Sequence, residues 1–175
     1  YNNLAVTTWY RAVVQSGVCA STTSASAKIT ITAASVGGTV TTSTTVCSGV
    51  NGAVLTLAGK TGSVLNWESS TDGGTTWANI VNTGTTQSYS NITTTTMYRA
   101  SVQNGSCTLA KSASATITVN PTSVGGSVSG TASYCTTTNS GTFTLSGHTG
   151  TVQRWESSTD SSTWTPLVNV TTTQN

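Results

Sequence analysis

Few side chains in this sequence carry titratable groups that could act in catalysis or bind a metal. The acids are Glu68, Asp72, Glu156 and Asp160, and the only histidine is His148. General acid–base catalysis uses paired titratable groups, and zinc or calcium sites use clusters of His, Cys, Asp or Glu. Glu68 and Glu156 each stand alone in their stretch of sequence. The sequence therefore predicts no enzymatic activity, no metal site and no cofactor.

Two short stretches carry an aspartate in a turn-like pattern. Residues 70–77 read Ser-x-Asp-x-Gly-x-Thr-Trp, which resembles the Asp box of sialidase-like propellers, a structural hairpin turn remote from their catalytic site. Residues 158–164 repeat the pattern without the glycine and with one residue fewer. Propeller blades recur every ~40–50 residues, so boxes this sparse do not indicate a propeller. We expect Asp72 and Asp160 to hold structural turns by accepting backbone hydrogen bonds.

The tryptophans that end these two stretches are candidates for a ligand surface. The faces of Trp77 and Trp164 could stack on sugar rings, because aromatic faces bind flat apolar ring surfaces well. The alternative is that both rings pack against their own hairpins. The sequence leaves both interpretations open.

The composition excludes further classes of function. Thr and Ser supply 67 of 175 residues, and 6% of the chain is charged, against about 25% in an average soluble domain. Six Lys and Arg with a net charge of +2 do not make the basic patch that nucleic-acid binding requires. No run of about 18 apolar residues suggests membrane insertion. Four cysteines in so charge-poor a chain favour an extracellular, oxidising compartment.

Internal repetition is the strongest signal in the sequence. Ser-Val-Gly-Gly occurs at 35–38 and at 123–126, Tyr-Arg-Ala at 10–12 and at 98–100, and Trp-Glu-Ser-Ser at 67–70 and at 155–158, always 88 residues apart. Trp164 lies 87 residues after Trp77, which indicates a single deletion. Joined head to tail, residues 172–175 and 1–4 would continue the same pattern. We therefore expect a tandem array cut in mid-repeat, with the C-terminal half of one repeat at 1–34, a complete repeat at 35–121 and the N-terminal half of the next at 122–175.

The hydrophobic pattern within one repeat predicts strands. Apolar and polar residues alternate with a period of two, and helical spacing is missing. The expected strands are 54–57, 64–69 with Trp67 inward and Glu68 outward, 76–81, 87–92, 97–103 and 107–119. About seven short strands with turns every 8–12 residues are typical of an immunoglobulin-like sandwich. The predicted fold class is therefore all-β, with tandem immunoglobulin-like β-sandwich repeats of about 88 residues. In such a sandwich Glu68 and Arg99 can form an ion pair on the solvent side.

The ordered motifs resemble a known group of repeats. Val-Cys-Ser-Gly, Leu-Thr-Leu, Trp-Glu-Ser-Ser-Thr-Asp, Tyr-Arg-Ala and Asn-Gly-Ser-Cys, in this order, are similar to immunoglobulin-like repeats of giant cell-surface adhesins of gliding bacteria (SprB-type) and other type IX-secreted proteins. The resemblance implies a structural stalk or fibre of a long, extracellular, cell-surface adhesin that serves attachment or gliding motility. Its partners would be neighbouring repeats, surface glycans or other adhesin chains. The alternative is a glycan-binding repeat that uses Trp77 and Trp164.

Four cysteines allow three disulfide pairings. We expect Cys47 to pair with Cys107 inside the complete repeat, because both would lie on neighbouring strands of the sandwich, and Cys19 and Cys135 to pair outside this stretch. The rival scheme joins Cys19 to Cys47 and Cys107 to Cys135. Closing the 60-residue loop from Cys47 to Cys107 would contribute about 4 kcal/mol in the chain-entropy estimate. It would also leave 28 residues per repeat free to extend under tension.

Overall fold

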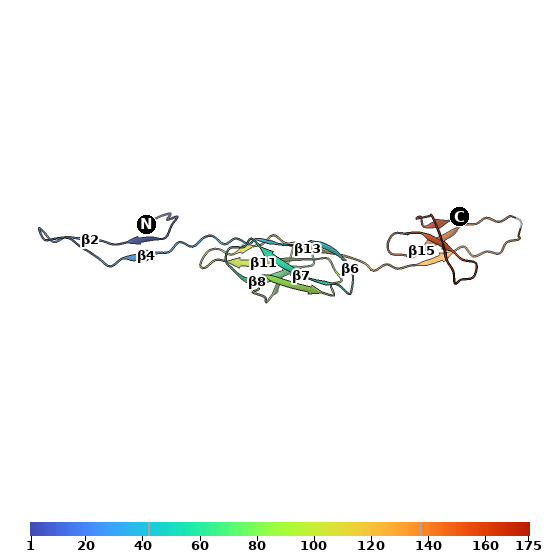
Figure 1. Cartoon of the computed structure of the whole chain (residues 1–175), viewed down its shortest axis with the longest axis horizontal. Coiled ribbons are helices and arrows are strands. Elements are labelled where there is room, and N and C mark those ends of the chain that lie inside the picture. The colour runs from blue at the N-terminus through green and yellow to red at the C-terminus, as the bar shows by residue number, and fades with distance from the viewer. Residues whose placement is uncertain (42, 137) are drawn as a thin grey trace.

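The computed structural model describes residues 1–41, 43–136 and 138–175, and every regular element within these ranges is a β-strand. Figure 1 shows three groups of strands that follow one another along the longest axis. The blue group is N-terminal, the cyan-to-yellow central group is a β-sandwich, and the orange-to-red group is C-terminal. The all-β class predicted from the period of two is confirmed.

Nine strands build the central sandwich, and their order in the sheets differs from their order in the chain. They are β5 Thr39–Val40, β6 Thr44–Cys47, β7 Gly52–Ala58, β8 Ser63–Ser70, β9 Ala78–Ile80, β10 Thr86–Ser90, β11 Thr96–Gln103, β12 Ala110–Lys111 and β13 Ala115–Asn120. One sheet has the order β10–β7–β5. The other has the order β6–β13–β11–β8–β9, and β12 pairs with the end of β11.

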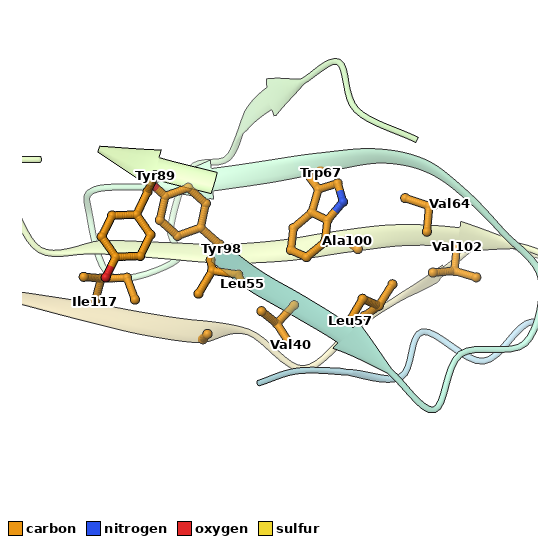
Figure 2. Packing of buried hydrophobic residues seen from close by; sticks show 11 residues of the cluster. Val40, Leu55, Leu57, Val64, Trp67, Tyr89, Tyr98, Ala100, Val102 and Ile117 are labelled. Atoms are coloured by element: carbon orange, nitrogen blue, oxygen red, sulfur yellow. The ribbon is translucent and has the colours of Figure 1, made fainter. Parts of the chain in front are cut away.

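The core lies between these two sheets, and the alternation of each strand explains which side chains enter it (Figure 2). Its members are Val40, Leu55, Leu57, Val64, Trp67, Tyr89, Tyr98, Ala100, Val102, Ala115 and Ile117. Trp67 is fully buried, and its indole N–H donates to the Gly84 carbonyl at 2.9 Å. The ring of Tyr89 stacks on that of Tyr98 with centroids 6.1 Å apart. A satisfied indole makes the largest core side chain compatible with a dry interior.

Strand β8 shows how one strand serves both the core and the surface. Trp67 lies opposite Ala100 of β11, and the next residue, Glu68, lies opposite Arg99. Successive side chains of a strand point to opposite faces, so the indole enters the core and the carboxylate lies on the outer face. The predicted orientation of both residues is confirmed.

The predicted strand 107–119 is interrupted. Ser101 of β11 pairs with Lys111 of β12, whereas Tyr98 pairs with Ala115 of β13, so one extra residue lies between the two ladders. This is a β-bulge, which bends a strand and leaves a residue outside the ladder. The Ser112 hydroxyl accepts a bond from the Ala100 N–H at 2.9 Å inside it. Hydrophobic alternation alone gives no sign of such an insertion.

Strands β6 and β13 form the parallel pair of the sandwich, with a register that runs from Thr44 opposite Ile117 to Cys47 opposite Asn120. Both strands run from the end where the chain enters the sandwich to the end where it leaves. At the entry end, the Asn104 side chain donates to the Ala33 carbonyl at 2.9 Å. At the exit end, the Ser48 N–H donates to the Asn120 carbonyl at 2.8 Å.

The terminal groups repeat the pairings of the sandwich. Their strands are β1 Thr8–Tyr10, β2 Val13–Val14, β3 Thr22–Thr23 and β4 Ala27–Ile29, then β14 Ser127–Ser129, β15 Phe143–Ser146, β16 Trp155–Ser157, β17 Thr165–Leu167 and β18 Thr173–Gln174. Thr8 pairs with Ile29 as Thr96 pairs with Ile117, 88 residues later. The β14–β15 ladder repeats the β5–β7 ladder with the same offset. The sequence period is therefore also a period of hydrogen-bonded registers.

Equivalent residues differ in burial between the groups. Tyr98 is 6% exposed in the sandwich, whereas Tyr10, its counterpart in the N-terminal group, is 44% exposed. The N-terminal group has the counterparts of β11, β12 and β13, and the C-terminal group has those of β5, β7, β8, β9 and β10. Each terminal group therefore presents the inner face of a sandwich that its own described strands do not cover.

The expected disulfide between Cys47 and Cys107 is not formed, and all four cysteines are free. Cys47 lies opposite Asn120 at the exit end, while the Cys107 carbonyl accepts a bond from Gln103 at the entry end. The length of β11 separates these ends, which is over ~20 Å at about 3.3 Å per residue, and a disulfide needs Cα atoms within about 7 Å. A position on neighbouring strands is not enough to form the disulfide, because the two cysteines lie at opposite ends of the sandwich.

The rival pairing fails for the same reason. Cys19 lies between β2 and β3 in the N-terminal group, whereas Cys47 ends β6, and Figure 1 shows β2 far along the axis from β6. Cys107 lies at the entry end of the sandwich, whereas Cys135 follows β14 in the C-terminal group, beyond the exit end at Asn120.

Candidate functional site: the Asp72 turn and the Glu68 cluster

The turn between β8 and β9 is organised around one carboxylate. Asp72 accepts a bond from the Ser70 hydroxyl at 2.7 Å and from the Thr76 N–H at 2.9 Å, and the Thr76 hydroxyl also donates to it. The Ser70 hydroxyl in turn accepts the Gly74 N–H at 2.9 Å. The side-chain and backbone bonds from Thr76, followed by that from Ser70, hold the pKa of Asp72 well below its usual range. The oxygens of the Asp72 carboxylate therefore already accept hydrogen bonds from residues of the same turn.

The second turn keeps this arrangement despite its missing residue. Asp160 accepts bonds from the Thr163 N–H at 2.7 Å, the Ser162 N–H at 2.8 Å and the Ser158 hydroxyl at 2.9 Å. These bonds lower the pKa of Asp160 to about 2. Ser161 adopts a φ of +59°, in the left-handed region that favours glycine. The chain thus accepts local strain to keep the carboxylate in place.

Glu68 joins two cations on the outer face of the larger sheet. Its carboxylate lies 2.7 Å from Arg99 Nε and 2.6 Å from Lys111 Nζ, and its side chain is 14% exposed. The predicted pair with Arg99 is confirmed. Partial burial raises the pKa of Glu68, but the bonds and charges of Lys111 and Arg99 outweigh it, so that the pKa is lowered. An acid that is this well compensated stays ionised and is a poor proton donor or acceptor near neutral pH.

Lys111 was not predicted as a member of this cluster. It comes from β12, and its ammonium also donates to the Ser101 hydroxyl at 2.8 Å. The shift of register at the bulge determines which β12 side chain lies beside Glu68. Positive charge in the last predicted strand was the available signal, but its register could not be read from the sequence.

Trp77 connects the turn with the ion cluster. The Arg99 guanidinium lies 3.8 Å from the centroid of its ring, and its indole N–H donates to the Gly74 carbonyl at 2.8 Å. A guanidinium over an indole is an attractive cation–π contact. One face of this indole is therefore covered by the protein.

Trp164 has a more open environment. It is 56% exposed and borders a cavity of about 490 Å³ together with Val128, Phe143, Trp155 and Leu167. The counterparts of three of these residues, at 40, 55 and 67, belong to the buried core of the sandwich. The cavity is thus the inner face of the C-terminal group, where the described residues provide no counterpart of β11 or β13.

The structure brings Asp72, Glu68 and Trp77 into one continuous network and leaves Asp160 and Trp164 in a separate group. Within the described ranges, three or more His, Cys, Asp or Glu side chains do not gather in a way that could hold a metal ion. The described residues also form no helix of the length and apolarity needed to cross a membrane.

Comparison with known proteins gives one family. A model described as a domain of unknown function (DUF8696) matches residues 1–33, 36–121 and 124–175. No curated protein and no solved structure matches the chain. Since the three matched segments cover nearly all of its length, the chain belongs to the DUF8696 family.

Proposed function

We propose that the chain is part of a structural stalk or fibre of a long, extracellular, cell-surface adhesin. The observation that carries this proposal is the parallel ladder between β6 and β13, from Thr44–Ile117 to Cys47–Asn120. Strand β13 is the last strand before the chain leaves the sandwich, and β6 is the second strand after the chain enters, preceded by the two-residue strand β5. Tension along the chain pulls them past each other along their lengths.

This geometry resists tension for a simple physical reason. Ladder hydrogen bonds run across the strands, so a pull along parallel strands strains all bonds of the ladder together. A pull that separates the strands from one end breaks the bonds one after another. The same ladder therefore resists the first pull more strongly than the second.

Other features agree with a spacer that presents binding domains located elsewhere. The three groups lie along one axis (Figure 1). The Glu68 carboxylate forms an ion pair with Arg99, and the Asp72 carboxylate accepts a hydrogen bond from its own turn. The neighbouring repeats are then the principal partners, and attachment or gliding motility is the process served.

Force spectroscopy on the reduced chain tests this proposal. Handles at the two termini load the β6–β13 ladder in shear, whereas handles at Val50 and Thr122 peel it open from the exit end. We expect the terminal pull to require a several-fold higher unfolding force. The two pulls use one fold and differ only in direction, so equal forces would contradict the proposal.

Glycan binding is the second candidate function, and the exposure of Trp164 beside an apolar cavity favours it. A glycan array would show binding that is lost in Trp164→Ala and retained in Trp9→Ala, a control with an exposed indole in the N-terminal group. Trp77→Ala tests the half-covered indole separately. Binding that survives all three variants, or no binding, would leave the stalk as the better proposal.

A further inference from the structure

We infer that successive repeats of this sequence are linked by a disulfide across their junction, which joins the exit-end cysteine of one repeat to the entry-end cysteine of the next. Cys47 and Cys135 are exit-end cysteines and Cys19 and Cys107 are entry-end cysteines, each pair separated by 88 residues. The inference uses the tandem array of the proposed function, but it does not require that the array carries tension.

The entry-end thiol contacts the chain that arrives from the preceding group. Cys107 Sγ lies 3.4 Å from the Ala33 carbonyl oxygen and 3.7 Å from that of Thr32. The loop is fixed in this position, because the Gln103 side chain donates to the Cys107 carbonyl at 2.8 Å and Asn104 bonds Ala33. Cys107 is therefore held against the junction itself.

The exit-end thiol lies beside the equivalent stretch of the chain that leaves. Cys47 is opposite Asn120 in the parallel ladder and is exposed. The Asn51 side chain donates to the Cys47 carbonyl at 2.8 Å, which fixes the end of β6. Neighbouring strands are about 4.8 Å apart.

The 88-residue period places both thiols at one junction. Thr32 and Ala33 precede the first Ser-Val-Gly-Gly motif as Asn120 and Pro121 precede the second. An entry-end cysteine that follows residue 121 would therefore contact Asn120 as Cys107 contacts Thr32. Since Cys47 is already the ladder neighbour of Asn120, both cysteines would lie beside the same residue, and the linkage requires that their Cα atoms come within the ~4.4–6.8 Å that a disulfide spans.

This arrangement also explains the four free thiols. Residues 1–175 hold one cysteine at each junction, Cys107 beside 32–33 and Cys47 beside 120–121. The pairing needs one cysteine from each of two consecutive complete repeats. Its formation is a thiol–disulfide exchange with an external disulfide: the two cysteines lose two protons and two electrons as one S–S bond forms, and the external disulfide is reduced to two thiols.

The linkage changes the covalent path along an array. From Cys107 the main chain reaches Cys135, the exit-end cysteine of the following repeat, in 28 residues. The disulfide at Cys135 then leads directly into the repeat after that. The shortest path is thus 28 residues for every two repeats, and much of it is already extended strand. Oxidised repeats could therefore extend little under tension, whereas reduction would allow up to 88 residues per repeat to unfold and extend.

A head-to-tail fusion of two copies, with Tyr1 of the second following Asn175 of the first, tests the linkage. The fusion completes a repeat from residues 122–175 and 1–34, so Cys19 of the second copy becomes the entry-end cysteine after the first copy's Cys47. One variant keeps only these two cysteines and has serine at the other six. With oxidised glutathione, we expect its monomer to fall from two free thiols to none.

The matched control keeps only Cys47 and Cys107 of the first copy. Its two thiols should not join to each other, because they lie at opposite ends of one sandwich. Tryptophan fluorescence before oxidation confirms that both fusions are folded. Persistence of both thiols in the first fusion, or an intramolecular disulfide in the control, would overturn the inference. Either result is independent of the pulling experiment, which uses reduced protein.

Discussion

At the level of single residues, hydroxyls and carboxylates are used to complete local structure. In the Asp72 turn, the Ser70 hydroxyl accepts the Gly74 N–H and the Asp72 carboxylate accepts the Thr76 N–H. At the bulge, the Ser112 hydroxyl accepts the Ala100 N–H. No buried side-chain nitrogen or oxygen of the described residues lacks a hydrogen-bond partner. The abundance of Thr and Ser thus provides internal acceptors and donors at low charge.

The Asp72 turn predicts a pH dependence of stability. Its bonds place the folded-state pKa of Asp72 below the ordinary value of 3.8. The stabilisation is therefore fully present above pH 3.8 and is lost as the pH falls further through the folded-state pKa. We expect Asp72→Asn to be less stable than the parent at pH 7, and the difference to narrow below pH 4. Urea denaturation at pH 7, 4 and 2.5 measures it, and a constant difference would contradict the assignment.

Trp67 predicts a large effect of truncation. Removing a fully buried indole leaves a cavity and an unpaired Gly84 carbonyl, so Trp67→Ala should lower the free energy of unfolding by about 3–5 kcal/mol. The matched control is Trp164→Ala, where the ring is 56% exposed and the change should be about 0.5 kcal/mol. Denaturant titration of both variants compares them, and similar losses would show that the core is not centred on Trp67.

At the level of elements, the Ser-Val-Gly-Gly motif has a steric explanation that its recurrence alone does not provide. A Cβ on Gly37 would lie 2.0 Å from the Lys111 carbonyl oxygen, because β12 crosses directly over it. At Gly125, the counterpart in the C-terminal group, a Cβ would meet nothing within 4 Å. The same glycine is therefore required only where the partner strand is present.

This difference predicts that the same substitution has a large effect at one position and almost none at the equivalent position. Gly37→Ala should destabilise the central sandwich, by about 3 kcal/mol or more, because backbone rather than a flexible side chain must move. Gly125→Ala should change stability by less than about 0.5 kcal/mol. Hydrogen exchange of the β12 and β13 amides reports the first effect. Equal protection of these amides in the two variants would argue against the close approach of Gly37 to the Lys111 carbonyl.

At the level of the whole sequence, each terminal group repeats part of the central core. Tyr10, Ala27 and Ile29 of the N-terminal group correspond to Tyr98, Ala115 and Ile117 of the sandwich. In the C-terminal group, Val128, Phe143 and Trp155 correspond to Val40, Leu55 and Trp67. Apolar burial contributes about 25 cal/mol per Å², so bringing the two faces together is favourable.

The head-to-tail fusion tests this complementarity. We expect amides of β1, β4 and β16 to exchange quickly in the single chain and to become as protected at the fusion joint as those of β11, β13 and β8. The reason is that the joint restores the registers of the central sandwich. The β1 and β4 strands of the first copy serve as the internal control, since they gain no partner. Unchanged amide exchange at the joint would contradict the complementarity of the two terminal groups.

The period of 88 residues, the alternation of apolar side chains and the Glu68–Arg99 pair follow from the sequence, because repetition, strand periodicity and opposite charge are local or one-dimensional signals. The bulge before β13, the place of Lys111 and the stacking of Trp77 on Arg99 depend on strand register, which is set by packing between residues far apart in the chain. The cysteines show the difference most clearly. Their spacing suggested a bond inside the repeat, because neighbouring strands can be inferred from order along the chain. Only the folded sandwich shows that Cys47 and Cys107 lie at its opposite ends, since the distance between them is determined by the length and direction of the strands.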